Sequence, residues 1–341
     1  MTGLFAYRLP GATDMVAFKS DSVENGLIAG SFVAAPFDCA DPERCAVSII
    51  PGQKITVADI NALLSDYMKP QEPGETKENQ SSANDDEYYF AMVRAMIEDI
   101  REGRLKKCVA SRRISQMGRL DVGATFTNLC SAYPNAFAFL FFTERTGLWM
   151  GASPELLLKK KGKEYLSMAL AGTKKSDSEQ EWGNKEIEEQ AIVSDYICRV
   201  FTRFHLNPKP GPRSAAEAGP VRHLRTMIEG HADEQEVALA ELLAELDPTP
   251  ALAGEPKDMA LKAIERYEDF DREYYGGYCG VLSAEGDAEL YVNLRSMKVE
   301  PNGCTLYVGG GITLDSVPED EYCETRAKAA TLCNHLAFHD R

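Results

Sequence analysis

Short apolar runs that follow one another directly, instead of alternating with helices, constrain the fold of this 341-residue chain most. Runs typical of strands occupy 107–114, 137–142, 148–150, 156–159, 290–299 and 305–308. Apolar side chains recur at helical spacing over 89–100, and further helices are expected at 185–204, 234–246, 256–267 and 318–337. Strands that come in neighbouring groups favour an α+β protein with antiparallel sheets over a doubly wound one.

A polar segment divides the chain near its first quarter. Residues 69–86 contain Pro70, Pro73 and Gly74 and almost no apolar residue, so we expect an exposed connector there. It separates a short amino-terminal part, 1–68, from the region 87–341. The hydrophobic content of 44% is enough for a large core, and we expect 1–341 to form a single large domain.

Charge and cysteine content exclude several classes of protein. The formal net charge of −16 would repel a nucleic-acid backbone, so no nucleic-acid partner is expected. The nine cysteines are scattered without any Cys-x-x-Cys pair, which suits a reducing cytoplasm. The first 18 residues lack the pattern of a signal peptide, and the most apolar run, 136–142, is too short to cross a bilayer. We expect a cytoplasmic protein without a membrane partner.

The last expected helix carries three charged residues on one side. Glu321, Glu324 and Lys328 are spaced three and four apart, after a proline that suits the first helical position. Spacing alone fits a solvated face with a Glu–Lys pair. It also fits two carboxylates for a hard cation with an ammonium beside them for an anionic ligand.

Two further features are open to more than one interpretation. Glu189 leads an otherwise apolar helical stripe, where a buried carboxylate needs either an arginine or a metal ion as its partner. Gly309, Gly310 and Gly311 follow an expected strand, and they either form a turn or let the backbone approach a carboxylate ligand closely. The five histidines have no metal-ligand or triad spacing, and Ser153 is not in a nucleophile elbow.

Read in order, several blocks resemble the chorismate-utilising enzymes: the isochorismate, salicylate, anthranilate and aminodeoxychorismate synthases. The resemblance covers about 86–330, whereas 1–68 is only weakly similar and shorter than usual. The blocks are KKCVASR (106–112), GASPELLL (151–158), LAGT (170–173), NKEIEEQ (184–190), LDPTPALAG (246–254), FDREYYGGYCG (270–280), LYVNLRS (290–296) and YVGGGITLDSVPEDEYCETRAK (307–328).

This resemblance implies a fold, a cofactor and a set of binding residues. The fold is the large anthranilate synthase component I-like α+β domain, with stacked antiparallel sheets surrounded by helices. The implied substrate is chorismate, and the implied cofactor is Mg²⁺, which prefers oxygen ligands. The implied metal ligands are Glu189, Glu321 and Glu324. The implied substrate-binding residues are Thr173, Ala251, Leu252, Arg295, Gly309, Gly311 and Lys328.

Two positions match the family's proton-transfer groups. Glu155 matches the general acid that protonates the departing C4 hydroxyl of chorismate, and Lys107 matches the general base that activates water for attack at C2. A lysine base must be neutral, which burial or nearby cations favour. The ammonia-using synthases resemble one another in having an amide at the position of Lys107. The resemblance therefore implies an isomerase, isochorismate synthase, and a monomer, since monomers are common among lysine-bearing members.

Three alternatives stay open at this point: a salicylate synthase, an anthranilate-type aminating synthase, or an inactive chorismate-binding protein. Asp247 stands where isochorismate synthases usually have a histidine, which would add negative charge near an anionic substrate. Ile187 and Glu188 also depart from the family's wording. The sequence leaves open whether the product serves menaquinone, siderophore or salicylate formation.

Overall fold

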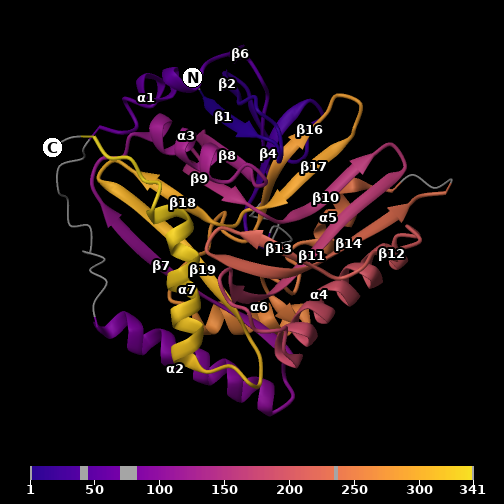
Figure 1. Ribbon diagram of the computed structural model, residues 1–341. Helices are drawn as coiled ribbons and strands as arrows, with labels where there is room; N and C mark the ends of the chain where they lie inside the picture. Colours follow the sequence, from indigo (N-terminus) through magenta and orange to yellow (C-terminus); the bar gives the residue numbers. More distant parts are fainter. Residues whose placement is uncertain (1, 39–44, 70–82, 234–236, 340–341) are drawn as a thin grey trace.

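The structure is a computed structural model that describes residues 2–38, 45–69, 83–233 and 237–339 (Figure 1). In these residues the strands form two large sheets in which every pairing is antiparallel. The first sheet has the strand order β15 (Gly254–Glu255), β7 (Lys107–Met117), β19 (Gly303–Ile312), β18 (Ser296–Glu300), β9 (Gly147–Ser153), β8 (Phe137–Thr143), β1 (Gly3–Arg8), β2 (Val16–Ser20) and β6 (Gln53–Lys54).

The second sheet is built in the same way and carries one strand off its main path. Its order is β12 (Lys209–Pro210), β14 (Val221–His231), β11 (Glu164–Lys175), β10 (Leu156–Lys161), β17 (Ala288–Val292), β16 (Tyr278–Leu282), β4 (Ser31–Ala35), β5 (Val47–Ile49) and β3 (Val23–Asn25), while β13 (Ser214–Ala218) pairs with β14. The α+β fold with stacked antiparallel sheets, expected from the sequence, is confirmed.

Aromatic side chains join the two sheets. Along β8, Phe137, Phe139 and Phe141 enter a buried cluster that also contains Phe5 of the first sheet and Phe32 of the second. The rings of Phe5 and Phe32 lie 5.0 Å apart, centre to centre. Because side chains alternate along a strand, the intervening residues of β8 face the opposite core. β8 is thus buried on both faces, which explains its unbroken apolar sequence.

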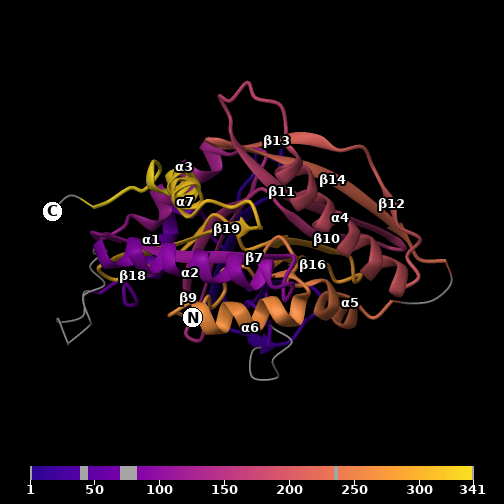
Figure 2. The ribbon, with the colours of Figure 1, turned by 90° about the horizontal axis from the view of Figure 1, so that it is seen from below.

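Helices cover the outer faces of both sheets. They are α1 (Ile60–Leu63), α2 (Ala83–Arg101), α3 (Val122–Ala132), α4 (Asn184–Arg203), α5 (Leu239–Leu246), α6 (Lys257–Tyr267) and α7 (Pro318–Cys333), with a short 3-10 turn η1 (Val57–Asp59) before α1. Figure 1 and Figure 2 show α4 running beside β11 and β14, which it contacts along its length. None of these helices combines the length and apolar character that a membrane crossing requires.

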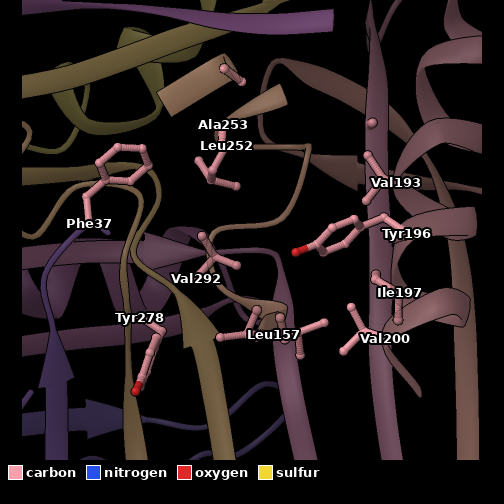
Figure 3. Close-up of a cluster of buried hydrophobic side chains, with 14 of the residues drawn as sticks. Phe37, Leu157, Val193, Tyr196, Ile197, Val200, Leu252, Ala253, Tyr278 and Val292 are labelled. Carbon is pink, nitrogen blue, oxygen red and sulfur yellow. The ribbon is translucent and has the colours of Figure 1, made fainter. Parts of the chain in front are cut away.

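The core beneath α4 reaches the loop that follows α5. Tyr196, Ile197 and Val200 of α4 point toward Leu157 and Val292 of the second sheet (Figure 3). Leu252 lies in the same cluster, and it is almost fully buried. The loop residue expected to line a ring pocket is therefore fixed by the main core.

Several sequence predictions are corrected by the structure. The expected strand 290–299 is two strands, β17 and β18, that lie in different sheets, because the chain crosses between the sheets at Asn293–Arg295. The expected connector 69–86 ends earlier, since α2 begins at Ala83; its residues 70–82 lie outside the described part of the chain. The expected helix 234–246 begins only at Leu239, with 234–236 undescribed, and the helix expected to reach 337 ends at Cys333.

Other elements were not predicted at all. The longest of them are β1, β2, β4, β11, β13, β14, β16 and α3. The first three lie in the amino-terminal part: β1 pairs with β8, β2 pairs with β1, and β4 pairs with β16. Strands from residues 1–68 therefore belong to both large sheets.

Candidate functional site

One cavity collects most of the residues singled out from the sequence. It is bounded by β7, β11, β14, β19, the loop after α5 and one side chain each from α4 and α7. Nine of the twelve predicted site residues line it: Glu155, Thr173, Glu189, Ala251, Leu252, Arg295, Gly309, Gly311 and Lys328. The other three, Lys107, Glu321 and Glu324, contact this lining from behind.

The glycines of β19 make room for carboxylates. A Cβ atom on Gly311 would lie 2.2 Å from Oε1 of Glu189, so a side chain here would displace the Glu189 carboxylate. A Cβ atom on Gly310 would lie 3.2 Å from Glu321 and 3.6 Å from Glu324, measured to their nearest carboxylate oxygens. Three glutamates from two helices therefore reach two consecutive glycines. The triple glycine lies within a strand, where the missing side chains let these carboxylates come close to the backbone.

Each of these glutamates contacts a lysine. The ammonium of Lys328 is 2.7 Å from the Glu324 carboxylate and donates a hydrogen bond to the Gly309 carbonyl, also 2.7 Å long. Lys185 donates to Glu321 at 2.8 Å. Lys107 Nζ lies 3.0 Å from Glu189 Oε1 but is not aligned for a hydrogen bond. Of these three pairings, the sequence suggested only a Glu–Lys pair on the last helix, as one of two alternatives, and the structure shows that this pair is Glu324–Lys328.

Burial and mutual repulsion perturb the carboxyls on α7. Burial raises the pKa of Glu321, and the neighbouring Glu324 charge raises it further against the pull of Lys185. Burial also acts to raise the pKa of Glu324, but Lys328 overrides it through charge and a hydrogen bond, so that this pKa falls below its ordinary value. Two neighbouring carboxylates thus share a site in which one ionises more readily than the other.

Glu155 is a buried acid that lines the same cavity. It directly precedes β10, and its Oε1 atom has no hydrogen-bond partner among the described residues. Burial raises the pKa of Glu155 to about 8, although Lys107, Lys328 and Arg295 act in the opposite direction. Its carboxyl group therefore carries a proton at neutral pH, as a general acid requires.

Arg295 enters the cavity from the crossing between the two sheets. Its backbone has a φ of 49°, an uncommon left-handed conformation for a residue with a side chain. The guanidinium is buried, which lowers its pKa, and the described residues form no salt bridge with it. A buried cation without a carboxylate partner is suited to bind an anion that enters from outside.

His223 is a site residue that the sequence did not reveal. It faces Thr173 across the β11–β14 pairing, and its Nε2 atom lies 3.0 Å from a guanidinium nitrogen of Arg295. Burial, together with the charges of Arg295 and Lys328, keeps the pKa of His223 well below its usual value. Only its cross-strand register marks it, because no short-range spacing joins it to the other residues.

Asp247, the residue found in place of an expected histidine, is also buried. Burial raises its pKa to about 8, and one of its carboxyl oxygens has no hydrogen-bond partner among the described residues. It follows α5 and does not line the cavity. The negative charge expected from this substitution is therefore largely absent at neutral pH.

The residues suit a hard cation in their chemistry, although their present arrangement is not that of a metal site. The three carboxylates at the glycines supply the oxygen ligands that Mg²⁺ prefers. In the described part of the chain, no three histidine, cysteine, aspartate or glutamate side chains already surround a single point as a metal site would. The lysine contacts account for this, because each carboxylate is turned toward an ammonium.

Together, the fold and the cavity are suited to bind a small anionic molecule between buried acid–base groups. A family model described as chorismate binding enzyme matches residues 44–337, most of the chain. The chain belongs to this family, and the resemblance inferred from the sequence blocks is confirmed.

Individual relatives support the same assignment. The chain is 30% identical over 259 residues to the vibriobactin-specific isochorismate synthase of Vibrio cholerae, covering 72% of this chain and 66% of that protein. It is 33% identical over 252 residues to isochorismate synthase EntC of Escherichia coli, covering 69% and 63% respectively. The chain thus spans slightly less than two thirds of the length of these two relatives.

A solved structure shares the fold across almost the whole chain. A putative 2,3-dihydroxybenzoate-specific isochorismate synthase, DhbC from Bacillus anthracis, superposes with a TM-score of 0.81 and covers 98% of this chain and 96% of its own. Its sequence is 24% identical, so this likeness shows the fold alone.

Proposed function

We propose that this protein is an isochorismate synthase, an isomerase that converts chorismate to isochorismate with the help of Mg²⁺. The observation that carries the proposal is a buried, protonated Glu155 on a cavity that also presents Arg295 and Lys328, with Lys107 directly behind the lining residue Glu189. The names of the Vibrio cholerae and Escherichia coli relatives support the same activity.

Substrate binding follows from the charges around the cavity. Chorismate carries two carboxylates, and Arg295 and Lys328 offer two cationic groups to them. Ala251 and Leu252 supply apolar contacts for the ring, and the core fixes Leu252 in place. Binding at Arg295 would give this buried guanidinium the counter-ion that it lacks.

Glu155 acts as the general acid. Its proton moves to the C4 hydroxyl as the C4–O bond breaks, so that the leaving group departs as water. Burial supports this role because it keeps the carboxyl protonated at the pH at which the enzyme works.

Lys107 acts as the general base. It takes a proton from the water that forms the new bond at C2, while the ring double bonds shift toward C4. One water is consumed and one released, so the reaction is an isomerisation. Lys107 must be neutral for this step, and its contact with Glu189 must therefore loosen in the active form.

Glu189, Glu321 and Glu324 would hold the Mg²⁺ ion at the glycines of β19. When bound, the ion supplies positive charge for a substrate carboxylate and the developing negative charge.

We further propose that the enzyme is a cytoplasmic monomer with no nucleic-acid partner, which the net charge of −16 and the scattered cysteines support. Size-exclusion chromatography with light scattering tests the monomer.

The product formed from chorismate tests the function. Purified protein is incubated with chorismate and MgCl₂, and the products are separated by chromatography. Isochorismate alone is expected. Salicylate with pyruvate would instead identify a salicylate synthase, anthranilate formed with added ammonia would reject water as the nucleophile, and no product under any condition would leave a chorismate-binding protein.

A further inference from the structure

Lys185 is the one lysine of the three Glu–Lys contacts that has no part in the proposed reaction. Lys107 is the proposed base, and Lys328 lines the cavity as a substrate-binding group. Lys185 does not line the cavity. It lies in the first turn of α4, where the helix dipole disfavours a cation, so its position calls for a separate explanation.

The partner of Lys185 explains that position. Glu321 is only 3% exposed, and a carboxylate so deeply buried requires a compensating positive charge. Lys185 supplies that charge through a hydrogen bond of 2.8 Å. The second oxygen of Glu321 faces the space at Gly310 that it shares with Glu324.

Lys185 differs from its partner in exposure. Its side chain is 33% exposed, so the ammonium can leave Glu321 for solvent by rotation about its own flexible stem. Lys107, by contrast, is only 1% exposed and has no such route. The contact between Lys185 and Glu321 is therefore the one of the two that can open without disturbing the core.

We propose that Lys185 is a built-in counter-ion of the cation site: it occupies Glu321 in the cation-free protein and gives way to a divalent cation. This inference rests on the proposed function in one respect, namely that a divalent cation binds at Glu321. Binding is then an exchange of one cation for another. The apparent affinity for the divalent ion is reduced by the fraction of molecules in which Lys185 still holds Glu321.

Isothermal titration of MgCl₂ into protein freed of metal, without chorismate, measures this exchange. The Lys185→Met variant is expected to bind Mg²⁺ about tenfold more tightly than the natural sequence, because the competitor is gone. The same variant is expected to melt at a lower temperature in EDTA, and to gain more from added Mg²⁺, since Glu321 has lost its only lysine partner among the described residues.

A matched control separates competition from a general change in charge. Lys174 lies next to Thr173, and its ammonium is 5.7 Å from the centre of the Trp182 ring. It donates a hydrogen bond to a backbone carbonyl, but it contacts none of the three glutamates in the described structure. Lys174→Met removes the same charge near the cavity and is expected to change the Mg²⁺ affinity less than threefold. Lys185→Arg keeps a cation at Glu321 and is expected to retain the weak binding.

Three results would overturn the proposal. They are an affinity that falls in Lys185→Met, an affinity that rises equally in Lys174→Met, and Mg²⁺ binding that is undetectable in both the natural sequence and the variant. Formation of isochorismate from chorismate is measured separately on the same preparations. Failure of the exchange is thereby distinguished from failure of the proposed activity.

Discussion

Single buried carboxyls set the chemistry of this cavity at the scale of the residue. Glu155 and Asp247 both lie in the interior, and burial raises the pKa of each to about 8. Only Glu155 lines the cavity. The same physical effect therefore produces a proposed general acid at one position and a neutral structural group at the other.

Glu155→Gln should lose activity and gain stability. Turnover is expected to fall about 100-fold or more, because the amide cannot donate the proton. The folded protein holds the Glu155 proton up to about pH 8, whereas the unfolded chain releases it near pH 4.5, so stability from this group is complete below pH 4.5 and is lost as the pH rises to about 8. The variant lacks this loss, and its melting temperature should exceed that of the natural sequence at pH 8. Near-normal turnover would remove Glu155 from the mechanism.

The pH profile of the natural enzyme offers a second measure of Glu155. If its proton is the one delivered to the leaving hydroxyl, kcat/KM should decline above about pH 8, about tenfold per pH unit, as the acid ionises. The profile is recorded at saturating Mg²⁺ and constant ionic strength. A flat profile between pH 7 and pH 9.5 would contradict the assignment.

Asp247→Asn should be nearly silent in catalysis. The aspartate is already uncharged at neutral pH, so kcat/KM should change less than threefold, while the melting temperature at pH 8 should rise for the reason given for Glu155. Paired measurements at pH 6 and pH 8 check both expectations. A large loss of activity at pH 6 would show that this carboxyl takes part in the reaction.

At the scale of the element, strand β19 joins the proposed metal-binding and substrate-binding parts of the cavity. Gly311→Ala would force a methyl group against the Glu189 carboxylate, 2.2 Å away, and against Lys107. We expect at least a 100-fold loss of turnover. Gly310→Ala, with 3.2 Å to Glu321, should cost less, and the remote Gly211→Ala should cost little. Steady-state kinetics ranks the three variants, and equal effects at 310 and 311 would refute this geometry.

Elements also show how far the sequence could be read. Helical spacing located α4 closely, because its apolar stripe faces a core. α7 has no such stripe, since its buried residues include Glu321 and Thr325, and Pro318 at its first position indicated where it begins. The sequence pattern could not locate the break at Asn293–Arg295, since the apolar run continues on both sides and only the tertiary structure assigns β17 and β18 to different sheets. The sequence did not identify His223 as a site residue for a related reason, because its neighbours Thr173 and Arg295 are 50 and 72 residues away along the chain.

At the scale of the whole molecule, the aromatic cluster between the sheets is the expected centre of stability. Phe32→Ala should lower the free energy of unfolding by about 3–5 kcal/mol, because a fully buried ring leaves a cavity. Met117→Ala, at a residue 80% exposed, should change it by less than about 0.5 kcal/mol. Denaturant unfolding monitored by fluorescence, with Trp149 in the cluster, compares the two. Equal effects would disprove the central role of the cluster.

The far-reaching strand pairings also affect how the chain is made. β4 pairs with β16, so that Ser31 lies opposite Leu282, and β1 pairs with β8, which is synthesised more than 100 residues later. During translation the first strands leave the ribosome long before these partners exist, and their aromatic side chains meanwhile have no cluster to enter. Both sheets can close only when synthesis is nearly complete, which makes the nascent chain a natural client for chaperones until that moment.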